Sequence, residues 1–191
     1  MTDHALEARS AFSDFTGLMS SRLIAHVRED LTLVTFCAAR GKRPALAAAL
    51  KDAYGIDLPL RAARVEGQEI AFVWNGPEQW LAVAERANGR DLERELKTVF
   101  AGLSSVVDQS DARVVIRIAG ARARDALAKG LPLDLHPRAF KPGMVAITHV
   151  SQMGVVLWQL DGAPTYELAI FRSFAPSFAR WLHHAAAEYM S

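Results

Sequence analysis

The sequence predicts an α+β fold in which two halves of mostly antiparallel strands are backed by helices. Segments rich in β-branched and aromatic residues alternate with segments whose apolar residues recur at helical spacing. A similar order of elements appears twice along the chain. With 191 residues, of which 51% are hydrophobic and 23% charged, the chain is able to bury a core. We expect a single body over residues 31–191, with repeats at about 31–102 and 103–191, after an N-terminal arm over 1–30.

The first half begins after the arm. Residues 1–30 mix charged residues, serines and scattered apolar side chains without a sustained period, and we expect one short helix there, over 20–27. Prolines at the first helical position and glycines after the last turn set the helix bounds that follow. The expected elements are a strand over 31–38, a helix over 44–54 ended by Gly55, a strand over 68–74, a turn at 75–77, and helices over 77–86 and 91–100.

The second half opens with two strands and closes with a helix. A turn at Ser110 and Asp111 separates the two strands, which favours a hairpin. The final helix starts at Ser173 or Pro176 and keeps apolar residues at helical spacing as far as Tyr189. The expected elements are strands over 104–110 and 113–120, a helix over 121–129 stopped by Gly130, a loop over 132–142, and a meander of strands over 145–150, 154–160 and 165–171.

The repeat is visible in two places. The strand and helix of 33–54 lead into Gly-Ile-Asp-Leu-Pro, and those of 113–129 lead into Gly-Leu-Pro-Leu-Asp-Leu. The strand of 69–74, followed by a turn and Trp80-Leu81, resembles the strand of 167–171, followed by a turn and Trp181-Leu182. An ancient duplication explains both similarities.

Charge and apolar runs exclude several classes of protein. Lysine and arginine total 22 against 21 aspartates and glutamates, with the two signs interleaved, which does not favour nucleic-acid binding. The N-terminal residues lack the pattern of a signal peptide, and the apolar runs are too short to span a bilayer. The single cysteine, Cys37, lies in an apolar run and is expected to be a buried thiol in a reducing compartment, which favours the cytoplasm.

Catalytic and cofactor motifs are missing from the sequence. No two of its 12 glycines are separated by one residue, which rules out G-x-G-x-x-G, and neither a P-loop nor G-x-S-x-G is present. One cysteine cannot form a Cys-rich zinc site, His183 and His184 diverge on a helix, and His136 and His149 have no visible ligand partner. We therefore expect no catalytic, cofactor-binding or metal-binding residues in the chain, and a structural role for Cys37.

Two sets of residues nevertheless keep a functional alternative open. Asp108 and Asp111 could act as an acid and base pair, although aspartate and serine in short loops usually bond the backbone of the turn. The four tryptophans could form the floor of a site for a flat heterocycle, or anchor a partner, although aromatic residues on such strands and helices mostly belong to the core. They are Trp74, Trp80, Trp158 and Trp181.

Four segments carry a resemblance to a known family. Along the chain they are residues 74–81, 107–120, 126–137 and 166–175, the last followed by Trp181-Leu182. In this order they resemble the gamma subunit of heterotetrameric sarcosine oxidase, and the resemblance extends from about residue 30 to the end.

That family is similar in turn to the folate-binding domain of aminomethyltransferases, the T-protein of glycine cleavage. Asp108, Ser110, Gly120 and Leu127 fit a pattern of D-x-S, strand, Gly, helix and Leu that recurs there. The resemblance implies a fold of duplicated ferredoxin-like halves, which agrees with the repeat.

The resemblance also implies a function. The complex converts sarcosine to glycine, producing hydrogen peroxide and 5,10-methylenetetrahydrofolate. FAD, FMN, NAD, zinc and tetrahydrofolate are expected in the partner subunits alpha, beta and delta, so that this chain would be a non-catalytic, structural gamma subunit. Two alternatives stay open: a stand-alone tetrahydrofolate-binding protein of aminomethyltransferase type, in which Asp108 or a neighbour assists proton transfer, and an assembly factor that binds flavoproteins transiently.

Overall fold

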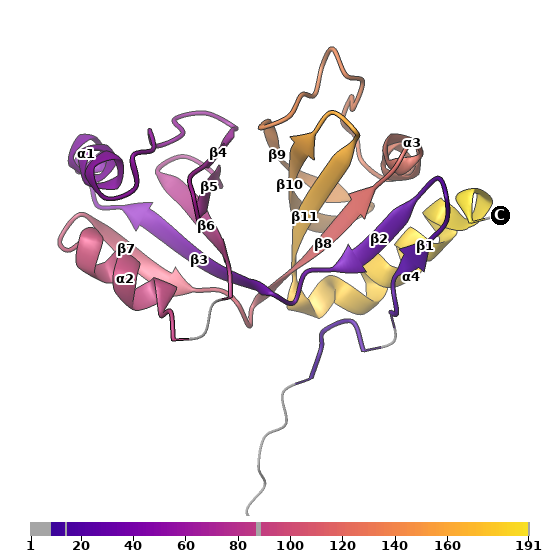
Figure 1. Cartoon of the computed structure of the whole chain (residues 1–191), viewed down its shortest axis with the longest axis horizontal. Helices are drawn as coiled ribbons and strands as arrows, with labels where there is room; N and C mark the ends of the chain where they lie inside the picture. The colour runs from indigo at the N-terminus through magenta and orange to yellow at the C-terminus, as the bar shows by residue number, and fades with distance from the viewer. Residues whose placement is uncertain (1–8, 14, 87–88, 191) are drawn as a thin grey trace, which may run out of the picture.

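The chain folds into four layers, in which helices cover the outer faces of two sheets (Figure 1). The computed structural model describes residues 9–13, 15–86 and 89–190. Within these residues the strands form an antiparallel sheet of five strands and an antiparallel sheet of six. The inner faces of the two sheets pack on each other, and each outer face carries a pair of helices.

The first sheet has the order β4-β5-β6-β3-β7 and is covered by α1 and α2. Its elements are β3 (Leu31–Ala38), α1 (Arg43–Tyr54), β4 (Arg64–Glu66), β5 (Ala71–Trp74), β6 (Gln79–Glu85), α2 (Leu92–Val99) and β7 (Ser104–Asp108). Apart from the edge strand β4, this half has the strand–helix–strand–strand–helix–strand order of a ferredoxin-like fold. The corresponding elements are β3, α1, β5, β6, α2 and β7.

The second sheet has the order β1-β2-β8-β11-β10-β9 and is covered by α3 and α4. Its elements are β1 (Leu18–Met19), β2 (Ile24–Val27), β8 (Arg113–Ala119), α3 (Ala123–Ala128), β9 (Val145–Val150), β10 (Met153–Asp161), β11 (Thr165–Phe171) and α4 (Ala175–Ala186), with short 3₁₀ turns η1 (Arg172–Phe174) and η2 (Ala187–Tyr189) flanking α4. Strand β2 takes the place beside β8 that β7 takes beside β3. The predicted α+β fold of two ferredoxin-like halves is thus confirmed.

Three apolar clusters correspond to the layers. Each sheet has an outer cluster under its own helices, and a third cluster joins the inner faces of the two sheets. The inner cluster contains Leu31 and Leu33 of β3, together with Val115 of β8 and Trp158 of β10. Because the two inner faces share this cluster, the halves form one body, and the seam between them is where side chains of both repeats meet.

Several predicted elements are found as expected. Helix α1 begins with a proline in its first turn and ends at Gly55, whose φ of 69° is left-handed. Asp91 caps α2 by accepting a hydrogen bond from the backbone N–H of Arg94 at 3.0 Å. The predicted meander is β9, β10 and β11, and the C-terminal helix carries a proline in its first turn.

Two predicted helices are wrong. Residues 77–86 form the turn before β6 and then β6 itself, a central strand with Trp80 on one face and Leu81 on the other, both buried. Leucine and alanine favour helices, but a central strand buried on both faces needs the same apolar run. Residues 20–27 likewise end in strand β2, which pairs with β8.

The predicted hairpin over 104–120 is also wrong, because its two strands belong to different sheets. Strand β7 pairs with β3, whereas β8 pairs with β2 and β11. Strand pairing therefore crosses the predicted boundaries at residues 30 and 102, and those domain bounds stay a prediction. The second part of the proposed repeat also fails, since Trp80 lies in a strand and Trp181 in a helix.

Candidate functional site

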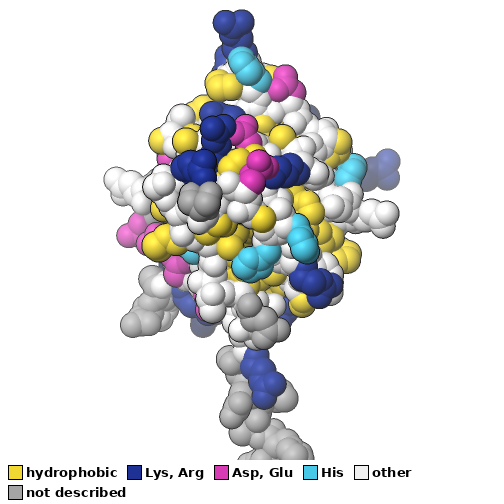
Figure 2. Space-filling view, turned by 90° about the vertical axis from the view of Figure 1, so that its right-hand side faces the viewer, with side chains coloured by type: hydrophobic (Ala, Val, Ile, Leu, Met, Phe, Trp, Pro, Cys, Tyr) yellow, Lys and Arg dark blue, Asp and Glu magenta, His cyan; other side chains and the backbone are white. Residues whose placement is uncertain are grey.

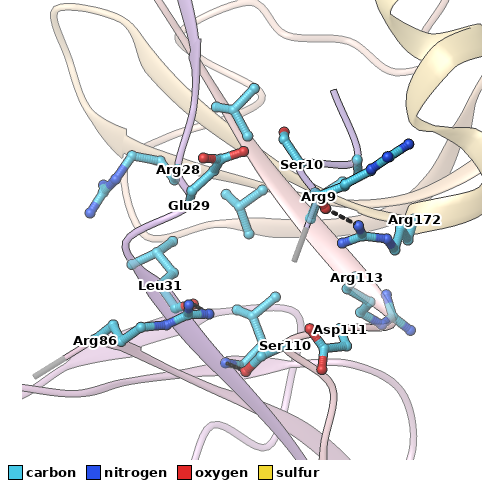
Figure 3. A pocket seen from close by; sticks show the side chains of 15 residues that line it. Arg9, Ser10, Arg28, Glu29, Leu31, Arg86, Ser110, Asp111, Arg113 and Arg172 are labelled. Carbon is cyan, nitrogen blue, oxygen red and sulfur yellow. Dashed lines mark hydrogen bonds between the residues drawn. The ribbon is translucent and has the colours of Figure 1, made fainter. Parts of the chain in front are cut away.

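A cavity of about 250 Å³ opens on the seam between the two sheets, where the β2–β3 and β7–β8 connections meet the end of β11 (Figure 3). We call it the arginine notch. Its polar lining is dominated by five arginines, accompanied by two acidic residues and two serines: Arg9, Arg28, Arg86, Arg113, Arg172, Glu29, Asp111, Ser10 and Ser110. Its floor is apolar and includes Leu31 and Leu33 of the inner cluster.

Three of these arginines have neutral contacts. The guanidinium of Arg113 lies 4.4 Å from the ring centre of Phe171, and its buried Nε has no hydrogen-bond partner. Arg172 donates a hydrogen bond to the backbone carbonyl of Arg9, and Arg86 donates one to the carbonyl of Leu31 at 3.4 Å. Among the residues that the structure describes, Arg86, Arg113 and Arg172 form no ion pair with a carboxylate. The notch therefore carries an excess of positive charge.

Burial affects the pKa of one notch residue. Desolvation lowers the pKa of Arg113 from its usual value, because the protein replaces water around the guanidinium. Arginine stays protonated in proteins even so. Arg113 is thus a cation held partly out of water without a matching anion, and an incoming carboxylate would compensate it.

The β7–β8 connection places Ser110 and Asp111 in the lining of the notch, directly after Asp108, the last residue of β7. Asp108 accepts a hydrogen bond from the backbone N–H of Ser110 at 2.7 Å, and Ser110 Oγ accepts one from the N–H of Leu33 at 3.0 Å. Asp111 is exposed and lines the notch. Asp108 and Ser110 thus bind the backbone of the turn and hold it to β3. This is the structural role that we gave as the alternative to an acid and base pair.

We expect Ser110→Ala to lower the free energy of unfolding by about 1 to 2 kcal/mol, since the half-buried N–H of Leu33 would lose its acceptor. Urea unfolding followed by fluorescence measures this change. Ser105→Ala, at an exposed position of β7, is the matched control and should change stability by less than about 0.5 kcal/mol. Equal stability of the two variants would contradict a role of Ser110 in holding the turn.

A second cavity of about 390 Å³ lies on the other side of Arg28 and Leu31, which line both. Glu167 on β11, only 3% exposed, is one of the residues that line it. Glu167 accepts hydrogen bonds from Arg28 at 3.0 Å, from Arg117 at 2.7 and 2.9 Å, and from the indole N–H of Trp158 at 2.9 Å. Arg117, Glu167 and Trp158 are cross-strand neighbours on β8, β11 and β10.

The buried carboxylate is fully engaged by protein groups. Burial raises the pKa of Glu167, while Trp158 and Arg28 act in the opposite direction. Arg28 is itself held by Asp30, with two contacts of 2.8 Å, and its side chain is 9% exposed. The Glu167 cluster thus fixes the β2–β3 connection, which forms one wall of the notch, to the centre of the second sheet.

The other candidate residues do not assemble into a site. Trp80 lies in the core of the first half, Trp158 lies between the sheets, and Trp74 and Trp181 are partly buried on different outer cores. The structure therefore separates the four tryptophans, and no floor for a flat heterocycle forms from them. Trp158 instead serves as a hydrogen-bond donor to Glu167.

The histidines and the cysteine are likewise dispersed. His136, His149, His183 and His184 are all exposed, and His183 lies edge-on against Phe15 at 5.4 Å. Cys37, predicted to be a buried thiol, is only partly buried in β3. Within residues 9–13, 15–86 and 89–190, no group of three or more His, Cys, Asp or Glu side chains is placed to hold a metal ion.

Sequence reasoning missed the arginines of the notch and Glu167. The arginines come from five separate segments, so their proximity is set by pairing between distant strands. A signal did exist for Glu167, which stands in the middle of the otherwise apolar strand over 165–171. A charged residue in such a strand needs a partner, and that requirement marks it as a candidate.

Comparison with known proteins gives consistent matches. The family model for "Sarcosine oxidase, gamma subunit family" matches residues 38–188. Sarcosine oxidase subunit gamma of Corynebacterium sp. strain P-1 is 33% identical over 147 residues, which cover 75% of this chain and 71% of that protein. The subunit of Arthrobacter sp. is 34% identical over 148 residues, with 75% and 71% covered.

Solved structures extend the likeness to the fold. A chain of heterotetrameric sarcosine oxidase from Corynebacterium sp. U-96, in complex with pyrrole 2-carboxylate, matches with a TM-score of 0.82 and 26% identity, covering 96% of this chain and 97% of that one. Aminomethyltransferase T of the glycine cleavage system from Bartonella henselae matches with a TM-score of 0.60 and 15% identity, covering 83% of this chain and 45% of that one. The second likeness concerns the fold alone.

Proposed function

Because the chain belongs to the sarcosine oxidase gamma subunit family, we propose that it works as the gamma subunit of a heterotetrameric sarcosine oxidase. The observation that carries this proposal is the agreement with a chain of such an oxidase over nearly the full length of both, at a TM-score of 0.82. Its role there is structural: the chain contributes surfaces that hold the assembly together, and the chemistry belongs to other chains.

The proposed partners are the alpha, beta and delta subunits of the complex, in the cytoplasm. FAD, FMN, NAD, zinc and tetrahydrofolate are assigned to those partners, and the complex would convert sarcosine to glycine, hydrogen peroxide and 5,10-methylenetetrahydrofolate. Among the described residues, no helix is long and apolar enough to cross a membrane. Figure 2 shows basic, acidic and apolar side chains interspersed on one face, which supports contacts with proteins rather than with nucleic acid.

Exposed apolar side chains support a role in assembly. Large side chains are exposed on β1, β7, β9, the end of β11 and the loop after α1: Met19 at 80%, Leu60 at 67%, Val107 at 51%, Ile147 at 50% and Phe171 at 44%. Such residues are available for contacts with partner subunits, whose interfaces bury apolar side chains.

Co-expression with candidate alpha, beta and delta subunits tests the proposal. The affinity-tagged chain should elute in size exclusion as a complex much larger than its own 20.9 kDa, with the absorbance of bound flavin. The tagged chain alone should show neither flavin absorbance nor oxidase activity. Elution of the chain by itself in the presence of all three partners would contradict the proposal.

The same purified chain also tests the alternative function, that of a stand-alone tetrahydrofolate-binding protein. Calorimetry of the isolated chain with tetrahydrofolate should give no saturable heat if the chain is a structural subunit. Saturable binding by the isolated chain, lost in Asp108→Asn, would instead favour the aminomethyltransferase-like alternative. The likeness to aminomethyltransferase T supports only the shared fold.

A further inference from the structure

We propose that the arginine notch is the docking site for an acidic segment of a partner subunit, whose aspartate or glutamate carboxylate enters between Arg86, Arg113 and Arg172. This inference rests on the proposed function, because it needs a partner polypeptide, and it specifies the chemistry of that partner. The Glu167 cluster is not part of the site, since its carboxylate is already occupied by Arg28, Arg117 and Trp158.

The first argument is charge. Arg28 is satisfied by Asp30 and Glu167, but Arg86, Arg113 and Arg172 contact a carbonyl, an aromatic ring and a carbonyl respectively. Guanidinium groups bind carboxylates through paired N–H donors, and the buried Nε of Arg113 still lacks an acceptor. A carboxylate in the notch would supply the negative charge that these guanidinium groups lack.

The second argument is the surface around the notch. Phe171, 44% exposed, stacks on Arg113, and Phe174, 37% exposed, lies two residues after Arg172 in the short turn η1. Aromatic residues and arginines are enriched in protein interfaces relative to the rest of the protein surface. This apolar rim favours a polypeptide over a free anion, because a free anion has nothing to cover the two rings.

The third argument is shape and support. At about 250 Å³ the notch is too small for a dinucleotide and large enough for one or two side chains. Figure 3 shows Arg113 and Asp111 on one side of the notch and Arg86 on the other. The walls come from both sheets and are fixed by the Glu167 cluster and the Ser110 turn, so the site is formed before the partner arrives.

Competition for assembly tests the proposal. Two copies of this chain with different tags, one wild type and one variant, are co-expressed with the partner subunits, and the ratio of the tags in the purified complex is measured. Arg86→Glu and Arg113→Gln should be incorporated about thirtyfold less than wild type or worse, because an opposing carboxylate loses its partner. Arg138→Glu, at an exposed position of the loop between α3 and β9, is the control and should compete equally.

Asp111→Asn gives a prediction of opposite sign. Asp111 is exposed, and removing its negative charge from the notch should increase incorporation severalfold, a gain that damage to the fold would not produce. Far-UV circular dichroism and thermal unfolding of each isolated variant establish that the variants are folded. A photo-crosslinking residue at position 111 should capture a partner peptide that contains aspartate or glutamate.

The outcomes separate this inference from the proposed function. If wild type assembles and the two arginine variants compete equally with it, the docking site is overturned while the subunit proposal stands. Cross-linking to a peptide without a carboxylate also overturns it. If citrate or inorganic phosphate stabilises the isolated wild-type chain but not Arg113→Gln, and assembly is unaffected, the notch holds a small anion and the proposal is overturned. If wild type itself does not assemble, the proposed function fails first.

Discussion

Replacing Glu167 by alanine should lower the free energy of unfolding by about 3 to 5 kcal/mol, the largest effect that we expect from a single side chain. The substitution leaves Arg28, 9% exposed, and Arg117 without their shared carboxylate, and leaves the indole N–H of Trp158 without an acceptor. Removing one partner of a buried ion pair leaves the remaining charge incompletely compensated: Arg28 keeps Asp30 and Glu85, whereas Arg117 loses its carboxylate, and the desolvation of these charges dominates the cost. Urea unfolding measures the change.

Matched variants show whether burial is the cause. Glu66→Ala removes a carboxylate that contacts Arg64 at 2.8 and 3.0 Å but is 65% exposed, and it should cost at most about 1 kcal/mol. Glu167→Gln keeps the shape and one acceptor oxygen and should fall between the two alanine variants. A cost for Glu167→Ala as small as that for Glu66→Ala would mean that water replaces the carboxylate.

Much of the fold could be predicted because its signals are local. Proline at the start and glycine at the end mark α1, and a capping aspartate with apolar residues at helical spacing marks α2. The meander of β9, β10 and β11 follows from three apolar runs separated by short turns. The resemblance to the gamma subunit family, read from four segments, is confirmed by the family match over residues 38–188.

The errors arise where distant strands decide the structure. Strand β6 is central, so both of its faces are buried and its composition resembles that of a helix. Strand β2 forms because β8 offers a pairing edge, and the turn at Ser110 joins two sheets instead of closing a hairpin. None of these pairings leaves a local pattern in the sequence.

The site shows the same division between local and distant information. The turn role of Asp108 and Ser110 follows from residue type and spacing, and the structure agrees with it. The notch brings together Arg86, Arg113 and Arg172 from the end of β6, the start of β8 and the end of β11. Their proximity follows from the packing of the two sheets. The residue types alone, without the fold, could not have predicted that these three arginines lie together.

Gly120→Ala should lower the free energy of unfolding by about 2 to 4 kcal/mol, and the physical reason lies in the hairpin of β1 and β2. Gly120 has a φ of 110°, which side chains rarely adopt, and a Cβ there would lie 2.5 Å from the carbonyl oxygen of Arg22 and 3.2 Å from Cα of Leu23. Because these are backbone atoms, the hairpin would have to move away from β8.

A second glycine allows the steric clash to be distinguished from the backbone strain as the cause of the destabilisation. Gly102 has a φ of 71°, but a Cβ there meets nothing within 4 Å, so Gly102→Ala carries only the conformational strain, about 1 kcal/mol. We expect Gly120→Ala to cost more than Gly102→Ala and to accelerate amide hydrogen exchange in β2 while β3 to β7 stay protected. Equal costs, with unchanged exchange in β2, would show that the hairpin yields without loss of pairing. The glycine of the recurring family pattern would then be required for its φ alone, and not for the close approach of the N-terminal strands.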